Sequence, residues 1–574
     1  MIKNGTRKWM YLVIGGIIII ILGFALTLAF TQKSESAIPT STIAAIPPII
    51  STVKEQSQYG FDDPLWWKHA VFYEIFVRSF YDSNGDGIGD FNGITQKLDY
   101  LNDGDPSTNT DLGINAIWLM PIFPSPSYHG YDVIDYSTVN PDYGTVEDFT
   151  RLLNEAHKRG IHIIIDFVIN HTSDLNPWFV SAQDPMNEYH NWYIWSSSDP
   201  GYPGPWGEKV WHKANNGLYY YGIFWSGMPD LNFENPDVTG KMEEIAHYWL
   251  VDVGVDGFRV DGARHLIEEG KIQSNTKSTI TWFQNFEKLI KTWNQEYMTV
   301  GEIWDSSYVT TSYINSQSFD MVFDFDLANA IITTVAMGDA QALSANIDSE
   351  VNLYDYHGMA TFLTNHDMNR VMSQLGEDAN RMKHAATILL TIPGTPFIYY
   401  GEEIGMVGLK PDEQLRTPMQ WSADNEGGFT SGRPWELPNF SYKKVNVAAQ
   451  VGDDSSLLSL YRTLIQARLS HPALLDGKYQ KVDTSNSALY AGMREKGNDI
   501  VLTIINLKDV VIENPYFKFK GDLPSGKYEI KNLLGNEDID ASIELVKNGE
   551  FLEFTFSKDI GSHQNLLLQF IPIK

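Results

Sequence analysis

The chain has 574 residues, 43% of them hydrophobic and 20% charged, a composition typical of a folded protein with roughly two to four domains. Acidic residues outnumber basic ones 72 to 42, and the net charge of −30 argues against a nucleic-acid partner, whose phosphates it would repel. The sequence contains no cysteine, which excludes disulfides, thiolate zinc sites, cysteine nucleophiles and a lipid anchor on cysteine.

An apolar run near the N-terminus predicts contact with a membrane. Basic residues precede an uncharged run from Met10 to Phe30, which is long enough to cross a bilayer. This order keeps the N-terminus inside and places the rest of the chain outside. Residues 1–30 are therefore predicted to be a transmembrane anchor, or else a long signal peptide cleaved after Ala29. In both cases the body of the protein is exported, as a membrane-anchored or a secreted protein.

The next segment, residues 31–62, is rich in Ser, Thr, Pro and Ile and has neither helical nor strand periodicity. This composition predicts a spacer between the membrane and the folded body. A packed N-terminal arm is the alternative.

The stretch DSNGDGIGD (Asp82–Asp90) predicts a site for a hard cation. Carboxylate or carboxamide oxygens recur at every second residue, with glycines between them for sharp turns, a pattern that suits Ca²⁺. The helix–loop–helix calcium motif also requires a bidentate Glu at its twelfth position, where this sequence has Gly93. A calcium sensor of that type is therefore excluded. A loop closed by its own Asx turns, without metal, is the alternative.

Eight short runs of β-branched and aromatic residues predict eight buried strands. They are apolar throughout and do not alternate, which is typical of parallel strands covered on both faces. Amphipathic helical stretches separate several of them, so the order favours an α/β fold, the (β/α)8 TIM barrel. The runs begin at Ala70, Ala116, His162, Gly257, Tyr297, Met321, Gly358 and Thr395.

One helical stretch, GTVEDFTRLLNEAHKRG, illustrates the alternation. Thr145 is placed as its N-cap, Asp148 follows three residues on, and Gly160 closes it. The apolar residues that fall on one face at helical spacing are Phe149, Leu152, Leu153 and Ala156.

Two regions interrupt or follow the barrel. An oversized insertion after the third run, residues 171–235, is dense in Trp, Tyr, Pro and Gly and predicts a small irregular domain beside the barrel mouth. Its aromatic side chains either stack on the rings of a ligand or fill the insertion's own core. The barrel is then formed by residues 63–170 and 236–474. From residue 475 to 574, short alternating runs predict a C-terminal antiparallel β-sandwich domain.

Polar residues gather at the C-terminal ends of the predicted strands. In barrel enzymes this end carries the chemistry, because the loops that follow the strands meet there. The residues are Arg78, Asp166, Asn170, Asp261, Glu302, Asp326, His366, Asp367 and Glu402.

Three of these acids, Asp261, Glu302 and Asp367, predict glycoside hydrolysis. Arg259 lies two residues before Asp261 on one strand, so both side chains point to the same face and the guanidinium favours an ionised carboxylate. Acids that converge on one barrel mouth repel one another, which raises the pKa of the least stabilised acid. An ionised carboxylate beside a protonated one is the pair that cleaves glycosidic bonds. Acids on the surface or in salt bridges are the alternative.

Four motifs together resemble the conserved regions of the α-amylase family, glycoside hydrolase family 13. They are DFVINH (166–171), GFRVDGARH (257–265), GEIW (301–304) and FLTNHD (362–367), and they occur in the family's order and at its strand positions. The resemblance covers about residues 65 to 574, including the inserted domain and the C-terminal β domain. The set is specific, whereas each motif alone would be weak.

The resemblance implies a role for each site residue. Asp261 would be the nucleophile that forms a covalent glycosyl–enzyme intermediate, Glu302 the general acid and then base, and Asp367 the residue that distorts the sugar ring. Configuration would be retained if the first two carboxyls lie about 5–5.5 Å apart. The residues implied to bind the same sugar are Tyr131, which would stack under it, and Arg259, His171, His366, Asp412 and Arg416.

The resemblance also implies a structural calcium ion that fastens a long βα loop. Its ligands would be Asp82, Asn84, Asp86, Asp90 and the Ile88 carbonyl. A second calcium site at Asn170 and the His265 carbonyl occurs in many amylases, and the sequence does not identify its remaining ligands.

Features that separate the members of the family point in two directions. MPDLN (228–232) resembles a group intermediate between oligo-1,6-glucosidases and neopullulanases. Arg264 and His265 resemble the pair that α-amylases use for leaving-group sugars, whereas TPMQW (417–421) is shared with oligo-1,6-glucosidases. Asp132 would block the cleft in an exo-acting enzyme.

The sequence therefore predicts a monomeric, exported α-amylase that cleaves internal α-1,4 bonds of starch, glycogen and maltodextrins. The alternatives are an exo-acting α-glucosidase or oligo-1,6-glucosidase, and a neopullulanase-like or transglycosylating enzyme. A non-catalytic, amylase-like transporter heavy chain is a remote alternative, because such chains lose catalytic acids and tether their partner through a cysteine.

Overall fold

The computed structural model describes residues 63–354, 356, 358–535 and 540–573. The predicted membrane segment and the predicted spacer, residues 1–30 and 31–62, lie outside the described residues. Within the described part of the chain, no helix is both long enough and apolar enough to cross a bilayer. The membrane anchor therefore stays a prediction of the sequence.

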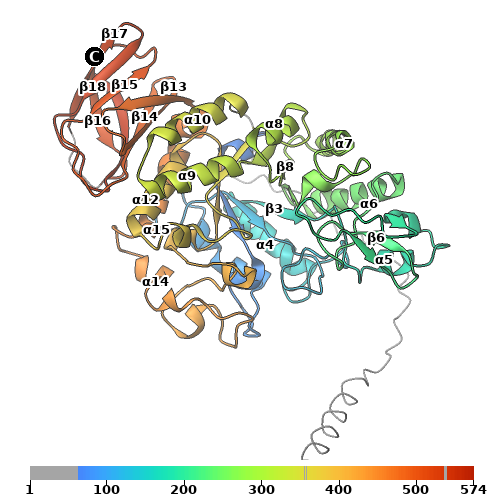
Figure 1. Ribbon diagram of the computed structural model, residues 1–574. Helices are drawn as coiled ribbons and strands as arrows, with labels where there is room; N and C mark the ends of the chain where they lie inside the picture. Colours follow the sequence, from blue (N-terminus) through green and yellow to red (C-terminus); the bar gives the residue numbers. More distant parts are fainter. Residues whose placement is uncertain (1–62, 355, 357, 536–539, 574) are drawn as a thin grey trace, which may run out of the picture. The chain divides into compact units, whose positions relative to one another are not determined.

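Eight parallel strands close into a barrel (Figure 1). Their order is β1-β11-β10-β9-β8-β7-β3-β2, so each strand pairs with the next barrel strand along the chain. Every strand lies within a run predicted from the sequence, which confirms the TIM barrel. The bounds are β1 Phe72–Ile75, β2 Ala116–Leu119, β3 His162–Phe167, β7 Gly257–Val260, β8 Met298–Gly301, β9 Met321–Phe323, β10 Met359–Phe362 and β11 Thr395–Tyr399.

The barrel strands are buried along their whole length, as their apolar sequences predict. Their register decides which polar side chains meet at the C-terminal end. Asp166 on β3 lies opposite Arg259 on β7, and Val260 on β7 lies opposite Gly301 on β8. The residues that follow β7 and β8, Asp261 and Glu302, therefore leave the barrel at the same level.

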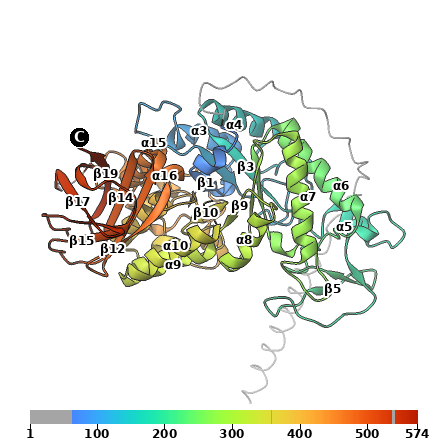
Figure 2. The same cartoon turned by 90° about the horizontal axis from the view of Figure 1, so that it is seen from above.

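Helices surround the barrel strands, and Figure 2 shows α3, α4, α6 and α7 among them. The predicted helix after Thr145 is α4, whose N-cap forms the reciprocal capping box with Asp148 and whose four predicted apolar residues are buried. The α-helices are α2 Val77–Phe80, α3 Phe91–Leu101, α4 Val146–Lys158, α5 Pro177–Ala182, α6 Pro236–His247, α7 Lys277–Trp293, α8 Ser307–Asn315, α9 Phe325–Met337, α10 Gln341–Tyr354, α11 Val371–Gln374, α12 Ala379–Thr391, α13 Asp412–Leu415, α14 Val447–Gln450, α15 Leu457–Ser470 and α16 Pro472–Asp476. Short 3₁₀ segments are η1 Trp66–His69, η2 His190–Trp192, η4 Ala263–His265, η5 Glu402–Ile404, η6 Asn425–Gly428 and η7 Phe440–Lys443, and η3 Tyr248–Val253 is a π-helical turn.

The insertion between β3 and α6 has little regular structure. Its sheet has three short antiparallel strands in the order β4-β6-β5, namely β4 Trp195–Ser196, β5 Trp211–Lys213 and β6 Tyr219–Tyr221. A small apolar cluster holds it together, built from Val210, Trp211, Tyr221 and Ile223. A bridge between His171 and Asp230 brings the two ends of the insertion together beside the barrel.

The C-terminal region consists of eight antiparallel strands, as the sequence predicts. Two of them join the two sheets of the sandwich, because β12 pairs first with β13 and then with β15, while β17 pairs with β16 and then β18. The pairing thereby closes on itself around one apolar core. The strands are β12 Lys478–Thr484, β13 Leu489–Lys496, β14 Asp499–Asn506, β15 Tyr516–Lys520, β16 Gly526–Asn532, β17 Ser542–Asn548, β18 Phe551–Thr555 and β19 Asn565–Pro572.

Candidate active site

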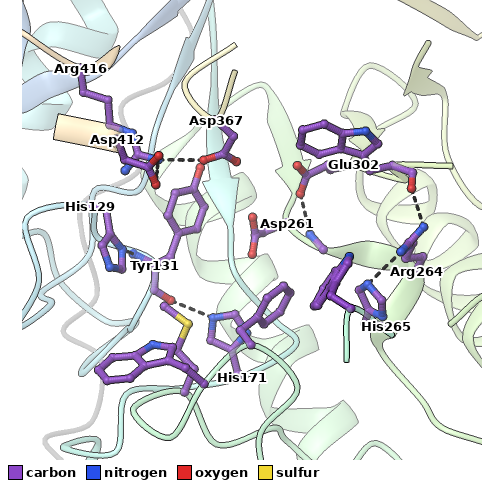
Figure 3. A pocket seen from close by; sticks show the side chains of 16 residues that line it. His129, Tyr131, His171, Asp261, Arg264, His265, Glu302, Asp367, Asp412 and Arg416 are labelled. Atoms are coloured by element: carbon purple, nitrogen blue, oxygen red, sulfur yellow. Dashed lines mark hydrogen bonds and ion pairs between the residues drawn. The ribbon is translucent and has the colours of Figure 1, made fainter. Parts of the chain in front are cut away.

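A cavity of about 590 Å³ opens where the barrel strands end, and Figure 3 shows the side chains around it. The three acids predicted to act on a sugar, Asp261, Glu302 and Asp367, all line it. They follow β7, β8 and β10, so the barrel brings together residues that lie more than a hundred positions apart. The other lining residues are His129, Tyr131, His171, Trp206, Phe224, Trp225, Met228, Gly262, Arg264, His265, Trp304, Asp412 and Arg416.

Arg259 contacts three acids, Asp166, Asp261 and Glu302. Its Nη1 donates to Asp261 Oδ1 at 2.7 Å and to Asp166 Oδ1 at 2.8 Å. Its Nη2 lies 2.9 Å from Glu302 Oε2, an ion pair without hydrogen-bond alignment. The side chain of Arg259 is fully buried against these carboxyls, and its contact with a sugar stays a prediction.

The position of Glu302 is fixed by the backbone beside Asp261. Its Oε2 accepts a hydrogen bond from the Gly262 N–H at 3.0 Å, and Figure 3 shows this contact near the centre of the cavity. Because one guanidinium contacts both Asp261 and Glu302, the two carboxyls are neighbours on one side of the cavity. Neighbouring carboxyls of this kind suit a retaining glycosidase, in which they lie about 5–5.5 Å apart.

Asp367 is held by two cations, its chain neighbour His366 and Arg416 at the end of helix α13. Arg416 Nη2 donates to its Oδ1 at 2.8 Å, and His366 Nε2 lies 3.2 Å from its Oδ2. The far nitrogen of that imidazole, Nδ1, contacts Glu74 Oε1 at 2.6 Å. Burial disfavours a charged imidazole, but the carboxylates of Asp367 and Glu74 outweigh it and raise the pKa of His366 to about 9. His366 is therefore a cation at neutral pH.

The acids respond differently to this environment. Burial opposes ionisation of Asp367, yet His366 and Arg416 overcome it and hold its pKa well below the ordinary value. Burial raises the pKa of Glu302, and the negative charges of Asp261 and Asp367 raise it further, while Arg259 opposes the rise. The pKa of Asp261 is also raised by burial, again against Arg259. An ionised Asp367 beside a more readily protonated Glu302 is the electrostatic arrangement that acid catalysis requires.

Carboxylates outnumber the buried cations around the site, which favours the binding of a proton there. Burial raises the pKa of Asp166 to about 7, so this residue competes with Glu302 for that proton. The carboxylates in contact with the site are Glu74, Asp166, Asp261, Glu302 and Asp367, and the buried cations are Arg259, His366 and Arg416.

Tyr131 and His171 form the floor beside these acids. The Tyr131 hydroxyl lies 3.0 Å from Asp166 Oδ2 and 2.7 Å from His366 Nε2, and its ring stacks on the imidazole of His366. His171 Nε2 contacts the Tyr131 carbonyl at 3.0 Å, and burial lowers the pKa of His171 to about 4. His171 is therefore neutral, and its Nδ1 has no partner within the described residues.

Asp132 occupies a different place from the one expected for a residue that blocks the cleft. It is buried, does not line the cavity, and accepts a hydrogen bond of 2.5 Å from Ser125 Oγ. A second hydrogen bond comes from Ser127 Oγ. Because both hydroxyls belong to the loop that carries Asp132, its carboxylate fastens that loop and lies outside the lining of the cavity.

Arg264 and His265 line the opposite side of the cavity from Asp412 and Arg416 (Figure 3). Arg264 Nε donates to His265 Nε2 at 3.0 Å, and its Nη1 donates to the Trp304 carbonyl and to Asp305 Oδ2. The pair thereby links the loop of the proposed nucleophile to the loop of the proposed acid. Burial lowers the pKa of His265 to about 4, so it is neutral.

Sequence reasoning missed part of the site. Glu74 lies inside strand β1. A charged residue in an otherwise apolar run could have indicated that it belongs to the site. Trp206, Phe224 and Trp225 belong to the insertion, whose aromatic residues could equally have formed its own core. Nothing in their local sequence separates the two possibilities, because only the folded insertion shows which rings face the cavity.

The loop Asp82–Asp90 is closed by its own amides. Asp82 accepts hydrogen bonds from the N–H groups of Asn84, Gly85 and Gly87, and Thr430 donates to it as well. Asp90 accepts from the backbone and the hydroxyl of Ser83 and caps helix α3. Among the residues that the structure describes, no group of three or more acidic or histidine side chains is spaced to hold a metal ion. The arrangement matches the alternative of a loop closed by Asx turns, and calcium binding there stays a prediction.

The place expected for a second calcium site contains an orphaned acceptor. Asn170 Nδ2 donates to Asp230 Oδ2 at 3.1 Å, while Asn170 Oδ1 is buried without a partner among the described residues. Burial raises the pKa of Asp230 to about 7. Amide and carboxylate oxygens are the donors that Ca²⁺ prefers, so Asn170 and Asp230 fit the ion chemically.

Comparisons with known proteins agree with the geometry. The family model "Alpha amylase, catalytic domain" matches residues 74–477. Alpha-amylase 3 of Dictyoglomus thermophilum is 39% identical over 472 residues, which cover 81% of this chain and 89% of that protein. The oligo-1,6-glucosidase of Parageobacillus thermoglucosidasius is 33% identical over 558 residues, covering 84% of this chain and 96% of that protein. The crystal structure of an alpha-amylase from H. orenii superposes with a TM-score of 0.77 at 42% identity, over 88% of this chain and 99% of that one.

Proposed function

Because the chain belongs to the α-amylase family of glycoside hydrolases, we propose that it is a retaining α-amylase that cleaves internal α-1,4 bonds of starch, glycogen and maltodextrins. The observation that carries the proposal is the contact of one buried guanidinium, Arg259, with both Asp261 and Glu302 in a single cavity. Two acids held side by side in this way can attack a sugar carbon and protonate its leaving group.

In the first step Asp261 attacks the anomeric carbon of the glucose unit in the cavity. The bond from that carbon to the leaving oxygen breaks, and the oxygen takes the proton of Glu302. The raised pKa of Glu302 favours the protonated form that this step needs, and the hydrogen bond from the Gly262 N–H holds its carboxyl in place. The product is a glucosyl ester on Asp261.

In the second step water attacks the same carbon, and Glu302, now ionised, takes its proton. The ester bond to Asp261 breaks, and two inversions give net retention of configuration. Asp367 stays ionised throughout because His366 and Arg416 hold its pKa low. Its role would be to accept hydrogen bonds from sugar hydroxyls, which strengthen as positive charge develops on the ring.

The choice of an endo-acting α-amylase rests on the leaving-group side of the cavity. Arg264 and His265 provide polar contacts there, and both the D. thermophilum and the H. orenii relatives are named α-amylases. The buried Asp132 lies outside the lining of the cavity. Together these features support a cleft that accepts a chain on both sides of the cleaved bond.

An exo-acting α-glucosidase is the second candidate. Arg416 Nη2 lies 3.6 Å from Asp412 Oδ2, and this ion pair stands at the end of the cavity where a longer chain would have to leave. The oligo-1,6-glucosidase relative also favours this alternative. If the pair closes that end, only one glucose unit fits beyond the cleaved bond.

Digestion of maltoheptaose and of isomaltose separates the two candidates. For an α-amylase we expect maltoheptaose to give a mixture of short maltodextrins, with α-anomers as the initial products. We expect no cleavage of isomaltose. Release of glucose alone, or cleavage of isomaltose, would contradict the α-amylase assignment. The Asp261→Asn variant serves as the inactive control and should keep the wild-type circular dichroism spectrum.

We also propose that the protein is exported, as its N-terminal apolar run predicts, and that it binds structural calcium. The oxygen donors of Asp82, Asn84, Asp86, Asp90 and Ile88 support one site, and those of Asn170 and Asp230 support the other. Added Ca²⁺ should raise the Tm of protein treated with a chelator, since a ligand that binds only the folded state stabilises it. Asp230→Asn and Asp86→Asn should each reduce that gain if their respective sites bind the ion.

A further inference from the structure

The two sides of the catalytic cavity differ in chemistry, and one of them has an unassigned aromatic wall. Asp412, Arg416 and Asp367 lie on one side of Asp261 in Figure 3, and Arg264 and His265 lie on the other. Three aromatic residues belong to the second side. The rings of Trp206 and Phe224 contact the His265 ring, and the Trp304 carbonyl accepts a hydrogen bond from Arg264.

Phe224 brings the insertion directly up to the reacting groups. An added Cβ on Gly262, the residue after Asp261, would lie 3.0 Å from the Phe224 ring. The same ring packs edge-on against His171 at 5.1 Å and His265 at 5.9 Å. Gly262 has a positive φ of 51°, so glycine there serves both the turn and the close approach of the ring.

Trp206 extends this wall away from the acids. Its ring lies 5.9 Å from Phe224 at an interplanar angle of 30°, and 5.3 Å from the His265 ring. The turn that carries it is closed by hydrogen bonds from Gly204 N–H to the Glu208 carbonyl and from Gly207 N–H to the Gly204 carbonyl. Gln273 Nε2 also donates to the Pro203 carbonyl at 3.3 Å, which ties the turn to the barrel.

Although its turn is fastened, Trp206 remains 58% exposed. A large aromatic ring that lines a cavity and still faces solvent is typical of a binding surface, since nothing in the fold requires its exposure. On the same side, Trp304 is 48% exposed and is backed by Phe325, whose ring stacks on it at 4.6 Å. Two supported, half-exposed indoles thus border the path of a leaving group.

We propose that Trp206 is the stacking platform for the leaving-group end of the substrate, beyond the glucose unit that meets Arg264 and His265. The apolar face of a glucose ring would pack on the exposed indole, so the residue would determine how strongly the enzyme prefers long α-glucan chains. The proposal rests on the proposed glucan hydrolysis and assigns to the insertion a specificity-determining role within it.

The same platform favours sugar acceptors in the second chemical step. A sugar bound on Trp206 places a hydroxyl where water would otherwise attack the glucosyl ester. Its oxygen bonds to the anomeric carbon, the bond from that carbon to Asp261 breaks, and the hydroxyl proton moves to Glu302. The product is a longer oligosaccharide, so transfer and hydrolysis compete at this side of the cavity.

A comparison of two substrates tests the platform. Maltoheptaose presents several glucose units as its leaving group, whereas p-nitrophenyl α-maltoside presents an aryl group. We expect Trp206→Ala to lower kcat/KM for maltoheptaose by about tenfold and for the aryl substrate by less than about twofold. Trp206→Tyr should restore most of the loss, and the fraction of transfer products at high maltose concentration should fall in the alanine variant only.

Phe440→Ala is the matched control, because Phe440 is 91% exposed and does not line the cavity. Equal losses on both substrates, or no loss on maltoheptaose, would overturn the proposal. If the wild type cleaves isomaltose and not maltoheptaose, the α-1,4 assignment fails separately. The comparison then uses isomalto-oligosaccharides of increasing length, and a loss that does not grow with leaving-group length would again overturn the role of Trp206.

Discussion

The two sides of the cavity offer different kinds of contact to a ligand. On the charged side, Asp367 is held by His366 and Arg416, and Glu74 supports the imidazole from behind. On the aromatic side, Trp206 and Trp304 are about half exposed and offer flat apolar faces. The charged residues contact one another at the end of the barrel, which holds them in one arrangement. On the aromatic side, Trp206 lies instead on a turn of the insertion.

We therefore expect the charged side to affect the rate of the chemical step and the aromatic side to affect which chains are bound. Buried charged groups in fixed contact with one another act on the developing charge of the transition state, where a misplaced atom costs orders of magnitude in rate. Exposed rings hold substrate and transition state almost equally, so they change which chains are bound and change the chemical step little. Substitutions on the two sides should therefore differ in size, in pH dependence and in their dependence on substrate length.

The largest effect is expected for the acids that Arg259 holds together. Asp261→Asn removes the proposed nucleophile, and kcat for maltoheptaose should fall by about 10⁴-fold or more. Glu302→Gln should cause a similar loss on maltoheptaose, yet a much smaller loss on p-nitrophenyl α-maltoside. The nitrophenolate leaves without a proton, so the first step no longer needs an acid.

Circular dichroism of both variants checks that the fold survives. An Asp261→Asn enzyme that retains more than about a hundredth of the wild-type rate would place the nucleophile elsewhere. An equal loss of Glu302→Gln on both substrates would remove the role of that residue as the acid.

An intermediate effect is expected on the charged side. Asp367→Asn keeps the shape of the side chain and removes the charge that faces His366 and Arg416. We expect kcat to fall by about 10²–10³-fold, the size of one lost transition-state contact. Steady-state kinetics on maltoheptaose measure it, and a change confined to KM would mean that Asp367 binds ground state and transition state alike.

The barrel and the acids could be predicted from the sequence, whereas the aromatic side could not. The barrel strands were predictable because burial on both faces makes them apolar throughout, and α4 because its cap and its apolar face are local in sequence. The acids were predictable because the ends of parallel strands must meet. The roles of the acids remain proposals, although all three line one cavity.

The aromatic side was beyond sequence reasoning for a physical reason. Trp206 and Phe224 lie in an insertion with short strands and a small core, so no periodicity indicates which rings face inward. Asp132 shows the opposite difficulty. Its position next to Tyr131 suggested contact with substrate, whereas the hydroxyls of Ser125 and Ser127, which take up its carboxylate, become neighbours only when the loop folds.

The dependence on pH should distinguish the two sides without any loss of fold. The proposed acid Glu302 must be protonated in the first step, so kcat/KM should fall as the pH rises through its raised pKa. The negative charge of Asp367 is one cause of that rise. Asp367→Asn should therefore move the basic limb of the profile to lower pH, whereas Trp206→Ala should leave both limbs in place. The measurement is kcat/KM of each variant across pH 4 to 10. If the basic limb of Asp367→Asn stays in place, the charge of Asp367 does not raise the pKa of the acid.

The smallest effect is expected at Asp412, where the charged side meets solvent. Its side chain is 39% exposed, and it lies 3.6 Å from Arg416 Nη2 and contacts Lys410. The pair with Lys410 is exposed on both sides, and such pairs contribute about 0–1 kcal/mol, while Arg416 keeps its shorter contact with Asp367, so Asp412→Asn should change kcat/KM for maltoheptaose by less than about fivefold. Asp412→Ala is more informative, because it removes the bulk as well as the charge. If the pair closes the cavity, the alanine variant should release longer products than the wild type, as additional glucose units pass the former barrier. If the cleft is already open, as an endo-acting enzyme requires, product lengths should stay the same while KM alone rises slightly.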